Sequence, residues 1–317
     1  MKRRNLLAFA CASMVASAAL ADDRTIRIIV GYSPGGSVDA VARLLAERLR
    51  VSLDQNVIVD NKPGAGGRLA LVELKRSAPD GNTLVFTPSG VLVIHPWLYQ
   101  NIGYDPLKDF TPLALTNKFD FAITSGPGAP SGDLKAVMEW MKSNPQKANY
   151  ATSGAGTVPH FVGQLLAQTT GVPLTHVAYR GGAPAAQDLI AGQVPLMIDT
   201  ASETLEHHRA GRVKILAMTG DRRNRAVPDI PTAKEAGFDF TADAFFGLYG
   251  PSGMQPARVQ RISRAVEQAV SAPAFQDRIY ALGLTPSYAG PTELTSLQAE
   301  QFRRWEAPIK SSGFKAE

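Results

Sequence analysis

Apolar residues from position 26 onward alternate between short continuous runs and positions spaced along one face of a helix. The run 26–30 is typical of a buried strand, and the apolar residues between 38 and 49 recur at helical spacing. Strands at 57–59 and 83–87 follow, with a helix over 69–76 between them. Strands that alternate with helices pair in parallel and bury both faces of their sheet. The pattern therefore predicts an α/β fold.

A second set of alternating elements begins after the Gly/Pro-rich segment 125–130. Helices are predicted over 133–143 and 202–210, and two more end at Gly171 and near Gly192, because glycine just beyond a helix is a common stop signal. The predicted strands of this set are 148–152, 174–178, 194–198 and 213–218. This part of the chain thus repeats the organisation of the first part.

The chain changes character after Pro228. Residues 240–249 are aromatic and apolar, as expected for a long strand that returns to the first part of the fold. Helices are predicted after it over 256–271, 273–282 and 291–306. The chain therefore crosses between its two parts twice.

These crossings predict a discontinuous first lobe, residues 22–123 and 241–317, around an inserted second lobe, residues 124–240. Two connections between lobes make a hinge, and the cleft between lobes is where a ligand is expected. Each lobe should be a largely parallel sheet flanked by helices.

The first 21 residues have the features of a cleaved secretory signal. Three basic residues at 2–4 precede a short apolar run, and Ala19 and Ala21 are small residues at the positions that a signal peptidase recognises. We expect cleavage after Ala21, and the arginine pair leaves the general secretory and twin-arginine routes both open. The single cysteine, Cys11, lies in this segment. The mature chain would therefore have no disulfide and no cysteine metal site.

Charge and hydrophobicity exclude two classes of function for the mature chain. Removal of the three basic residues of the signal leaves 30 of the 33 basic side chains, against 28 acidic ones. No basic stripe remains to suggest nucleic-acid binding. No later apolar stretch approaches the roughly 20 residues that span a bilayer. We therefore expect an exported protein that binds no nucleic acid and does not span the membrane after cleavage.

Glycine-rich turns at 35–37, 153–157 and 180–183 each connect the end of a predicted strand to the start of a helix. In open α/β sheets that edge is where ligands bind. A helix start presents free backbone N–H groups and a partial positive charge, and glycine lets a ligand approach the backbone closely. Ser37, Ser153 and Thr157 add hydroxyl groups. Such turns in both lobes predict an anion-binding cleft.

Three single residues have alternative interpretations. His160 is either a ligand contact or an ordinary polar residue at a helix start. Arg180 either pairs with a ligand carboxylate or is a surface charge. Asp199 ends an apolar strand, where it holds the hinge, binds a ligand amine or hydroxyl, or simply begins the next helix.

Enzyme motifs are not found in the sequence. The turn at Ser153 has Ala151 where a nucleophile elbow needs glycine, and no phosphate-binding Gly-x-x-x-x-Gly-Lys loop occurs. His207 and His208 lie near Glu203 and Glu206, but on a polar helix without a metal-binding motif. A solvated helix face is the favoured interpretation of this group.

The motifs resemble those of the substrate-binding receptors of tripartite tricarboxylate transporters, the Bug family. The similar stretches run in order through about 200 residues of the chain: Pro34-Gly35-Gly36 with Asp39 and Ala42-Arg43, the segment 61–67, the segment 79–84, Ser153 to Thr157 with His160, the segment 179–182, the segment 217–223 and the segment 228–232.

This resemblance implies a type II periplasmic binding protein, a Venus flytrap of two α/β lobes with no catalytic activity, no cofactor and no metal. It implies a carboxylate ligand held by backbone amides, hydroxyl groups and water, and a two-component membrane permease as partner. Family members bind di- and tricarboxylates, amino acids and aromatic acids. The ligand-binding residues predicted from the turns and the resemblance together are Tyr32, Pro34, Gly35, Gly36, Ser37, Thr87, Ser89, Ser153, Gly154, Gly156, Thr157, His160, Tyr179, Arg180, Gly181 and Asp199.

Two other functions stay open at this point. A periplasmic hydrolase or isomerase acting on a small acid would need a nucleophile with a base, or a metal, and the sequence displays neither. A ligand sensor that signals through a membrane kinase would share the cleft but not the permease.

Overall fold

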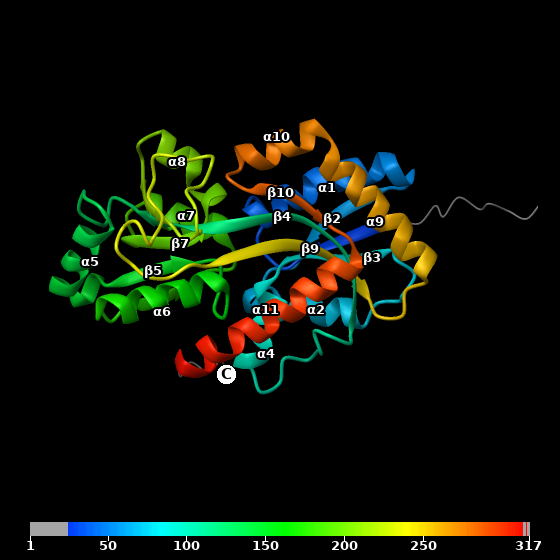
Figure 1. Ribbon diagram of the computed structural model, residues 1–317, viewed down its shortest axis with the longest axis horizontal. Helices are drawn as coiled ribbons and strands as arrows, with labels where there is room; N and C mark the ends of the chain where they lie inside the picture. The colour runs from blue at the N-terminus through cyan, green and yellow to red at the C-terminus, as the bar shows by residue number, and fades with distance from the viewer. Residues whose placement is uncertain (1–24, 313–314, 316–317) are drawn as a thin grey trace, which may run out of the picture.

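The computed structural model describes residues 25–312 and residue 315. Its strands form one ten-stranded sheet in the order β2-β1-β3-β9-β4-β7-β5-β6, with β8 and β10 also paired to β4, and helices cover both sides (Figure 1). The predicted α/β fold is confirmed. The predicted signal, with Cys11 and Ala21, lies outside the described residues.

The first half of the sheet has three parallel strands at its edge. β1 (Ile26–Val30) pairs with β2 (Val57–Asn61) on one side and β3 (Thr83–Pro88) on the other. Helix α1 (Ser37–Leu53) connects β1 to β2, and α2 (Arg68–Lys75) connects β2 to β3. The buried apolar residues of α1 recur every three or four positions, which turns one face of the helix toward the sheet. They are Val38, Val41, Ala42, Leu45, Ala46, Leu49 and Leu53.

The second half of the sheet repeats this arrangement. β5 (Asn149–Thr152) pairs in parallel with β6 (Thr175–Ala178) and β7 (Leu196–Thr200). The remaining elements of this half are α5 (Leu134–Ser143), α6 (Val158–Thr170), α7 (Gly182–Ile190), the 3-10 helix η3 (Ala201–Glu203), α8 (Leu205–Arg209) and β8 (Lys214–Met218).

Two long antiparallel strands join the halves. β4 (Phe110–Ser125) pairs with β9 (Asp243–Pro251) through its first part and with β7 and β8 from Phe121 or Ala122 onward. Figure 1 shows β4 and β9 side by side, passing from one half to the other. The sheet is therefore parallel within each half and antiparallel where the halves connect.

The C-terminal segment covers the first half. α9 (Pro256–Ser271) packs on α1 and β4, and α11 (Pro291–Ser312) packs on β4 and on the short helices α3 (Gly90–Val93) and α4 (His95–Leu98). Between them lie α10 (Pro273–Ala281) and β10 (Thr285–Ala289), which pairs with β4. The largest cluster of buried apolar residues includes members from both halves, so the core is continuous through β4 and β9.

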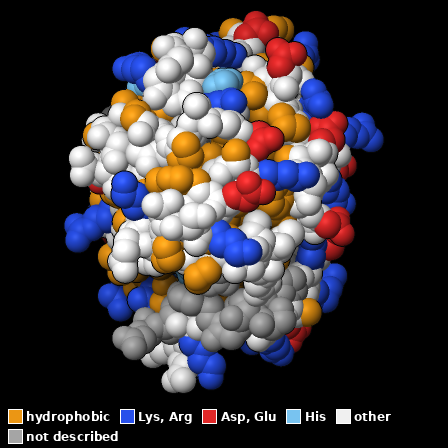
Figure 2. Space-filling view, turned by 90° about the vertical axis from the view of Figure 1, so that its left-hand side faces the viewer, with side chains coloured by type: hydrophobic (Ala, Val, Ile, Leu, Met, Phe, Trp, Pro, Cys, Tyr) orange, Lys and Arg blue, Asp and Glu red, His pale blue; other side chains and the backbone are white. Residues whose placement is uncertain are grey.

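The surface charges are mixed. Figure 2 shows the end of the molecule formed by the second half, where basic side chains are spread around the face with acidic and apolar ones between them. This distribution agrees with the similar numbers of basic and acidic side chains in the sequence, 33 and 28. In the part of the chain that the structure describes, no helix is both long and apolar enough to cross a membrane.

Candidate functional site

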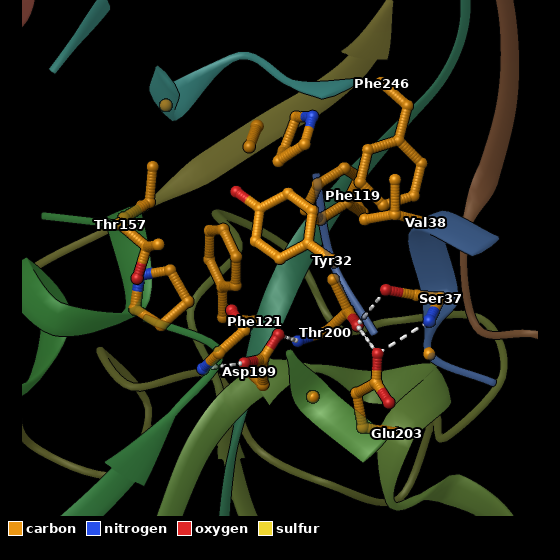
Figure 3. Close-up of a pocket in the computed structure, with 18 of the residues that line it drawn as sticks. Tyr32, Ser37, Val38, Phe119, Phe121, Thr157, Asp199, Thr200, Glu203 and Phe246 are labelled. Atoms are coloured by element: carbon orange, nitrogen blue, oxygen red, sulfur yellow. Dashed lines mark hydrogen bonds between the residues drawn. The ribbon is translucent and has the colours of Figure 1, made fainter. Parts of the chain in front are cut away.

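A cavity of about 40 Å³ lies between the two halves, beside the crossing strands β4 and β9 (Figure 3). The β1–α1 turn closes one side, and the β5–α6 turn with the end of β7 closes the other. Phe119 and Phe121 of β4 and Phe246 of β9 form an aromatic wall, with ring centroids 5.4 Å and 4.4 Å from Phe119. A cavity formed by strand–helix turns of two halves is a usual position for a small-molecule site.

The start of α1 is occupied by a carboxylate from the opposite half. Oε1 of Glu203 accepts a hydrogen bond from the backbone N–H of Ser37 at 2.7 Å. The hydroxyl of Thr200 donates to Oγ of Ser37 at 2.9 Å and lies 3.5 Å from Glu203 Oε1 (Figure 3). A carboxylate at this position is stabilised by the first free N–H of the helix and by its dipole. Glu203 therefore uses the anion site that the sequence predicts at this turn.

Two glycines make room for the Glu203 side chain. A Cβ atom on Gly182 would lie 2.3 Å from Cδ of Glu203, and one on Gly36 would lie 3.2 Å from its Oε1. Gly36 comes from the β1–α1 turn and Gly182 from the start of α7. Both glycines permit a close approach to the backbone, and in this structure the approaching group is Glu203.

Asp199 organises the second side of the cavity. Its Oδ2 accepts from the backbone N–H of Ser153 at 2.8 Å, and its Oδ1 accepts from that of Thr200 at 2.9 Å. Asp199 lies at the end of β7 and thereby fixes the β5–α6 turn to the neighbouring strand. Of the interpretations that the sequence left open, a structural role at the strand end is observed, and the residue also lines the cavity.

The cavity is acidic. Asp39, Asp199 and Glu203 line it, whereas no lysine, arginine or histidine is found among the described residues of its lining. Asp39 is paired with Arg43 at 2.9 Å and hydrogen-bonded to Asn61, which together hold its pKa below the usual range against the effect of burial. Asp199 and Glu203 form no ion pair within the described part of the chain. Two uncompensated carboxyl groups thus face one small cavity.

Burial raises the pKa of both groups. Desolvation, partly offset by the N–H groups of Thr200 and Ser153, raises the pKa of Asp199 to about 6. Desolvation and the nearby charge of Asp199 raise the pKa of Glu203 to about 7, against the opposing effect of the Ser37 hydrogen bond. Removing a carboxylate from water favours its protonated form, and a second carboxylate nearby adds to the shift. Ionisation of both groups therefore carries an energetic cost in this cavity.

Comparison with known proteins identifies the family. The model of the tripartite tricarboxylate transporter family receptor matches residues 41–314. The chain belongs to this family. The sequence resemblance to these receptors is therefore confirmed.

Solved structures of related binding proteins superimpose over nearly their whole length. The periplasmic binding protein BugD is 32% identical with a TM-score of 0.89, over 93% of this chain and 99% of BugD. MatC from Rhodopseudomonas palustris, solved with bound malate, is 32% identical with a TM-score of 0.85, over 90% and 99% of the two chains. A second R. palustris protein, solved with adipate, is 26% identical with a TM-score of 0.89, over 93% and 99%. This receptor therefore has the fold of that group.

The cavity of this receptor brings together only some of the predicted ligand-binding residues. Those that line it are Tyr32, Gly36, Ser37, Ser153, Thr157 and Asp199. Those that do not are Pro34, Gly35, Thr87, Ser89, Gly154, Gly156, His160, Tyr179, Arg180 and Gly181. Contact with a ligand stays a prediction for all of them.

The residues outside the lining have identifiable structural contacts. Thr87 and Ser89 are buried, and their neighbours Pro88 and Gly90 line the cavity instead. Nδ1 of buried His160 accepts from the N–H of Gly156 at 3.2 Å, and its ring stacks on His176. This places His160 in support of the β5–α6 turn rather than on the cavity surface.

The 179–182 segment contacts the first half through its backbone. The carbonyl oxygen of Arg180 accepts from both N and Oγ of Ser33 at 2.9 Å, while the Arg180 side chain is exposed. The hydroxyl of Tyr179 donates to Asp188, away from the cavity. This segment therefore closes the two halves against each other.

Sequence reasoning missed the aromatic wall and the role of Glu203. The segment 202–210 was interpreted as one solvated polar helix, but the chain forms η3 and the separate helix α8, and Glu203 at the end of η3 turns into the cavity. No group of three metal-ligating side chains suited to an ion occurs among the described residues, so Glu203, Glu206, His207 and His208 are not brought together as one. Its position in the sequence was the available signal, because Glu203 comes four residues after Asp199, at the end of the strand where ligands bind in such sheets.

Proposed function

We propose that this receptor is a periplasmic solute-binding protein that captures a small carboxylic acid in the cavity between its halves and delivers it to a two-component membrane permease. The observation that carries the proposal is the cavity between the halves, which is lined by strand–helix turns from both of them. The related structures with malate and adipate support a small organic acid as ligand.

The ligand carboxylate is best accommodated on the α6 side of the cavity. The backbone N–H of Val158 lies in the first turn of α6 and has no hydrogen-bond acceptor among the described residues. Ser153 and Thr157 line the cavity beside it with hydroxyl groups. A free first-turn amide with adjacent hydroxyls is a suitable site for a carboxylate.

The division into lobes belongs to the same proposal. Residues 22–123 and 241–317 would form one lobe and residues 124–240 the other, with β4 and β9 as the hinge. Opening would separate Ser37 from Glu203 and Ser33 from Arg180, and a ligand that touches both sides would favour closure. A sensor that reports this closure to a membrane kinase would use the same motion.

Export is the third part of the proposal. We propose that cleavage after Ala21 releases a mature chain that begins at Asp22, with the general secretory and twin-arginine routes both open. The intact mass of protein from a periplasmic extract tests this point. Secreted protein that retains residues 1–21 would contradict it.

A thermal-shift panel tests the ligand class. At about 100 times the dissociation constant, a ligand that binds only the folded protein adds about 2.7 kcal/mol of stability, which is several degrees in Tm for a chain of this size. We expect a shift with a small carboxylic acid and none with its amide or methyl ester. A shift with neutral sugars but with no acid of a broad panel would contradict the proposal.

Recovery of the ligand separates a receptor from a periplasmic hydrolase or isomerase. A receptor returns the stabilising acid chemically unchanged after long incubation, and mass spectrometry of the supernatant measures this. Conversion of the acid by the purified protein would contradict the assignment as a receptor.

A further inference from the structure

The two carboxyl groups of the cavity do not suit a ligand that is only an anion. Glu203 occupies the N–H of Ser37 at the start of α1, and Asp199 occupies the N–H of Ser153 at the β5–α6 turn. Each therefore fills one of the sites at which a ligand carboxylate would otherwise bind. A second carboxylate from a dicarboxylic ligand would meet like charge on this side of the cavity.

The acidic pair formed by Asp199 and Glu203 faces the cavity. Both residues line the cavity. Figure 3 shows their side chains on the same side of it, with Thr200 between them. Glu203 is partly exposed, whereas Asp199 is buried. Asp39, the third acidic residue of the lining, is already neutralised by Arg43. The acidic groups of the cavity that have no basic partner are thus Asp199 and Glu203.

Much of the remaining lining is apolar. Phe119, Phe121 and Phe246 supply rings, and Val38 and Val91 supply branched aliphatic groups. These side chains offer no hydrogen bonds, so they favour the hydrocarbon part of a ligand. A ligand that fits has a hydrogen-bond-donating cation at one end, a carboxylate near Val158 and an apolar body packed against the aromatic wall.

We propose that Glu203, together with Asp199, is the specificity determinant of this receptor and requires a protonated amine on the ligand. The ligand class is then an amino acid with an apolar or aromatic side chain. The ammonium group compensates the two carboxylates with charge-assisted hydrogen bonds, which neither a deaminated acid nor a dicarboxylate can make. This inference rests on the proposed function, because it assumes that the cavity binds a carboxylic acid.

Matched ligand pairs test the inference by isothermal titration calorimetry on the mature protein. The probes are phenylalanine and leucine, their deaminated analogues 3-phenylpropanoate and 4-methylpentanoate, and the dicarboxylates malate and adipate. We expect the amino acid of at least one pair to bind at least about tenfold more tightly than its deaminated analogue. Deaminated acids or dicarboxylates that bind as tightly as the amino acids, or more tightly, would overturn the inference and leave the proposed function intact.

Failure of the proposed function has a different signature. In that case none of the six acids binds, nor does any other amino acid or small carboxylic acid of a broad panel. Binding by phenethylamine alone, which has the amine but no carboxylate, would also refute the proposed function.

Substitution of Glu203 should weaken the binding of amino acids and strengthen the binding of dicarboxylates. Glu203→Gln should weaken amino-acid binding at least about tenfold, because it removes the charge and keeps the size. Glu203→Ala should in addition strengthen binding of malate or adipate, because it frees the N–H of Ser37 for a ligand carboxylate. Glu206→Gln is the matched control, since Glu206 is exposed and pairs with Arg209 on α8.

Circular dichroism verifies that each variant is folded, and a gain of dicarboxylate binding cannot result from misfolding. Amino-acid affinity equal to wild type in folded Glu203→Gln would overturn the inference. Unchanged dicarboxylate affinity in Glu203→Ala would overturn the part that concerns the α1 anion site.

Discussion

The two glycine-rich turns beside the cavity have similar sequences, and each binds a carboxylate of the chain from a different part of the fold. At the β1–α1 turn, the N–H of Ser37 is bound by Glu203, which lies 166 residues away in the chain. At the β5–α6 turn, Asp199 of the adjacent strand binds Ser153, and the first-turn amide of Val158 has no acceptor in the described structure. A glycine turn at a helix start predicts where an anion binds. It does not predict whether the anion belongs to a ligand or to the chain itself.

The largest expected effect comes from filling the occupied turn. Gly36 has a φ of −82°, which valine adopts without strain, but its Cβ would lie 3.2 Å from Oε1 of Glu203. Gly36→Val should therefore displace the Glu203 carboxylate and obstruct the cavity while the protein stays folded. We expect ligand affinity to fall at least about 100-fold, the equivalent of roughly 2.7 kcal/mol.

Titration calorimetry with circular dichroism measures both parts of this prediction. Gly290→Val, at a glycine remote from the cavity whose Cβ would make only ordinary contacts, is the control. Wild-type affinity in folded Gly36→Val would show that the ligand is not bound at this turn.

The ionisation of Glu203 gives the next largest effect, on the stability of the unliganded protein. Its pKa is raised to about 7, so folding favours the protonated form. That contribution is complete below the pKa of the unfolded chain, about 4.3, and is lost as pH rises through about 7. The unfolding free energy of Glu203→Gln relative to wild type should therefore rise by on the order of 2 kcal/mol between pH 5 and pH 8.

Urea unfolding at the two pH values measures this difference. Burial lowers the pKa of His95, His160 and His176 and gives them the opposite pH dependence, but both proteins contain them and their contributions cancel. A relative stability that stays constant or falls with pH would be inconsistent with a carboxylate held at a cost in the cavity.

A smaller effect is expected at the turn that Glu203 does not reach. The hydroxyl of Thr157 donates to the carbonyl of Gly154 at 2.8 Å and lines the cavity. Thr157→Ala should weaken binding about tenfold and cost about 1 kcal/mol of stability, because it removes one buried hydrogen bond. Thr169→Ala, which removes the same type of bond from the exposed side of the same helix, is the control and should not change affinity. Equal affinities in the two variants would exclude a role for Thr157 in binding.

The smallest effect is expected at Arg180. Its carbonyl, not its guanidinium, contacts Ser33, and its side chain is exposed. Arg180→Ala should change the dissociation constant by no more than about twofold, since exposed charges contribute little. A loss of tenfold or more in calorimetry would mean that the guanidinium reaches the ligand.

The alternation of strands and helices was predictable because it depends on local periodicity. Helix α9 and the strands β1, β5 and β6 lie close to their predicted positions. β4 was not predicted as one strand, because Pro112, Asn117 and Lys118 interrupt its apolar pattern and its pairing with both halves is not a local property. The short helices α3 and α4 and the edge strand β10 were missed for lack of a periodic signal.

Only those parts of the site that are formed by residues close together in the sequence were predictable. The turns at Gly36 and Ser153 were found because glycine and hydroxyl residues at a strand–helix junction are visible in the sequence. Glu203 was not, because its role depends on the approach of the two halves and on the space left by Gly182. The aromatic wall was missed for the same reason, since Phe119 and Phe246 come together only through the pairing of β4 with β9.

The small molecule that copurifies with the receptor tests the central claim most directly. Protein purified from its expression host without added ligand is exchanged into volatile buffer and denatured. The released ligand is then identified and quantified by mass spectrometry. We predict a near-stoichiometric small acid that carries both a carboxyl group and an amine, and that is absent from Gly36→Val prepared in the same way. A near-stoichiometric ligand with no carboxyl group would contradict the account.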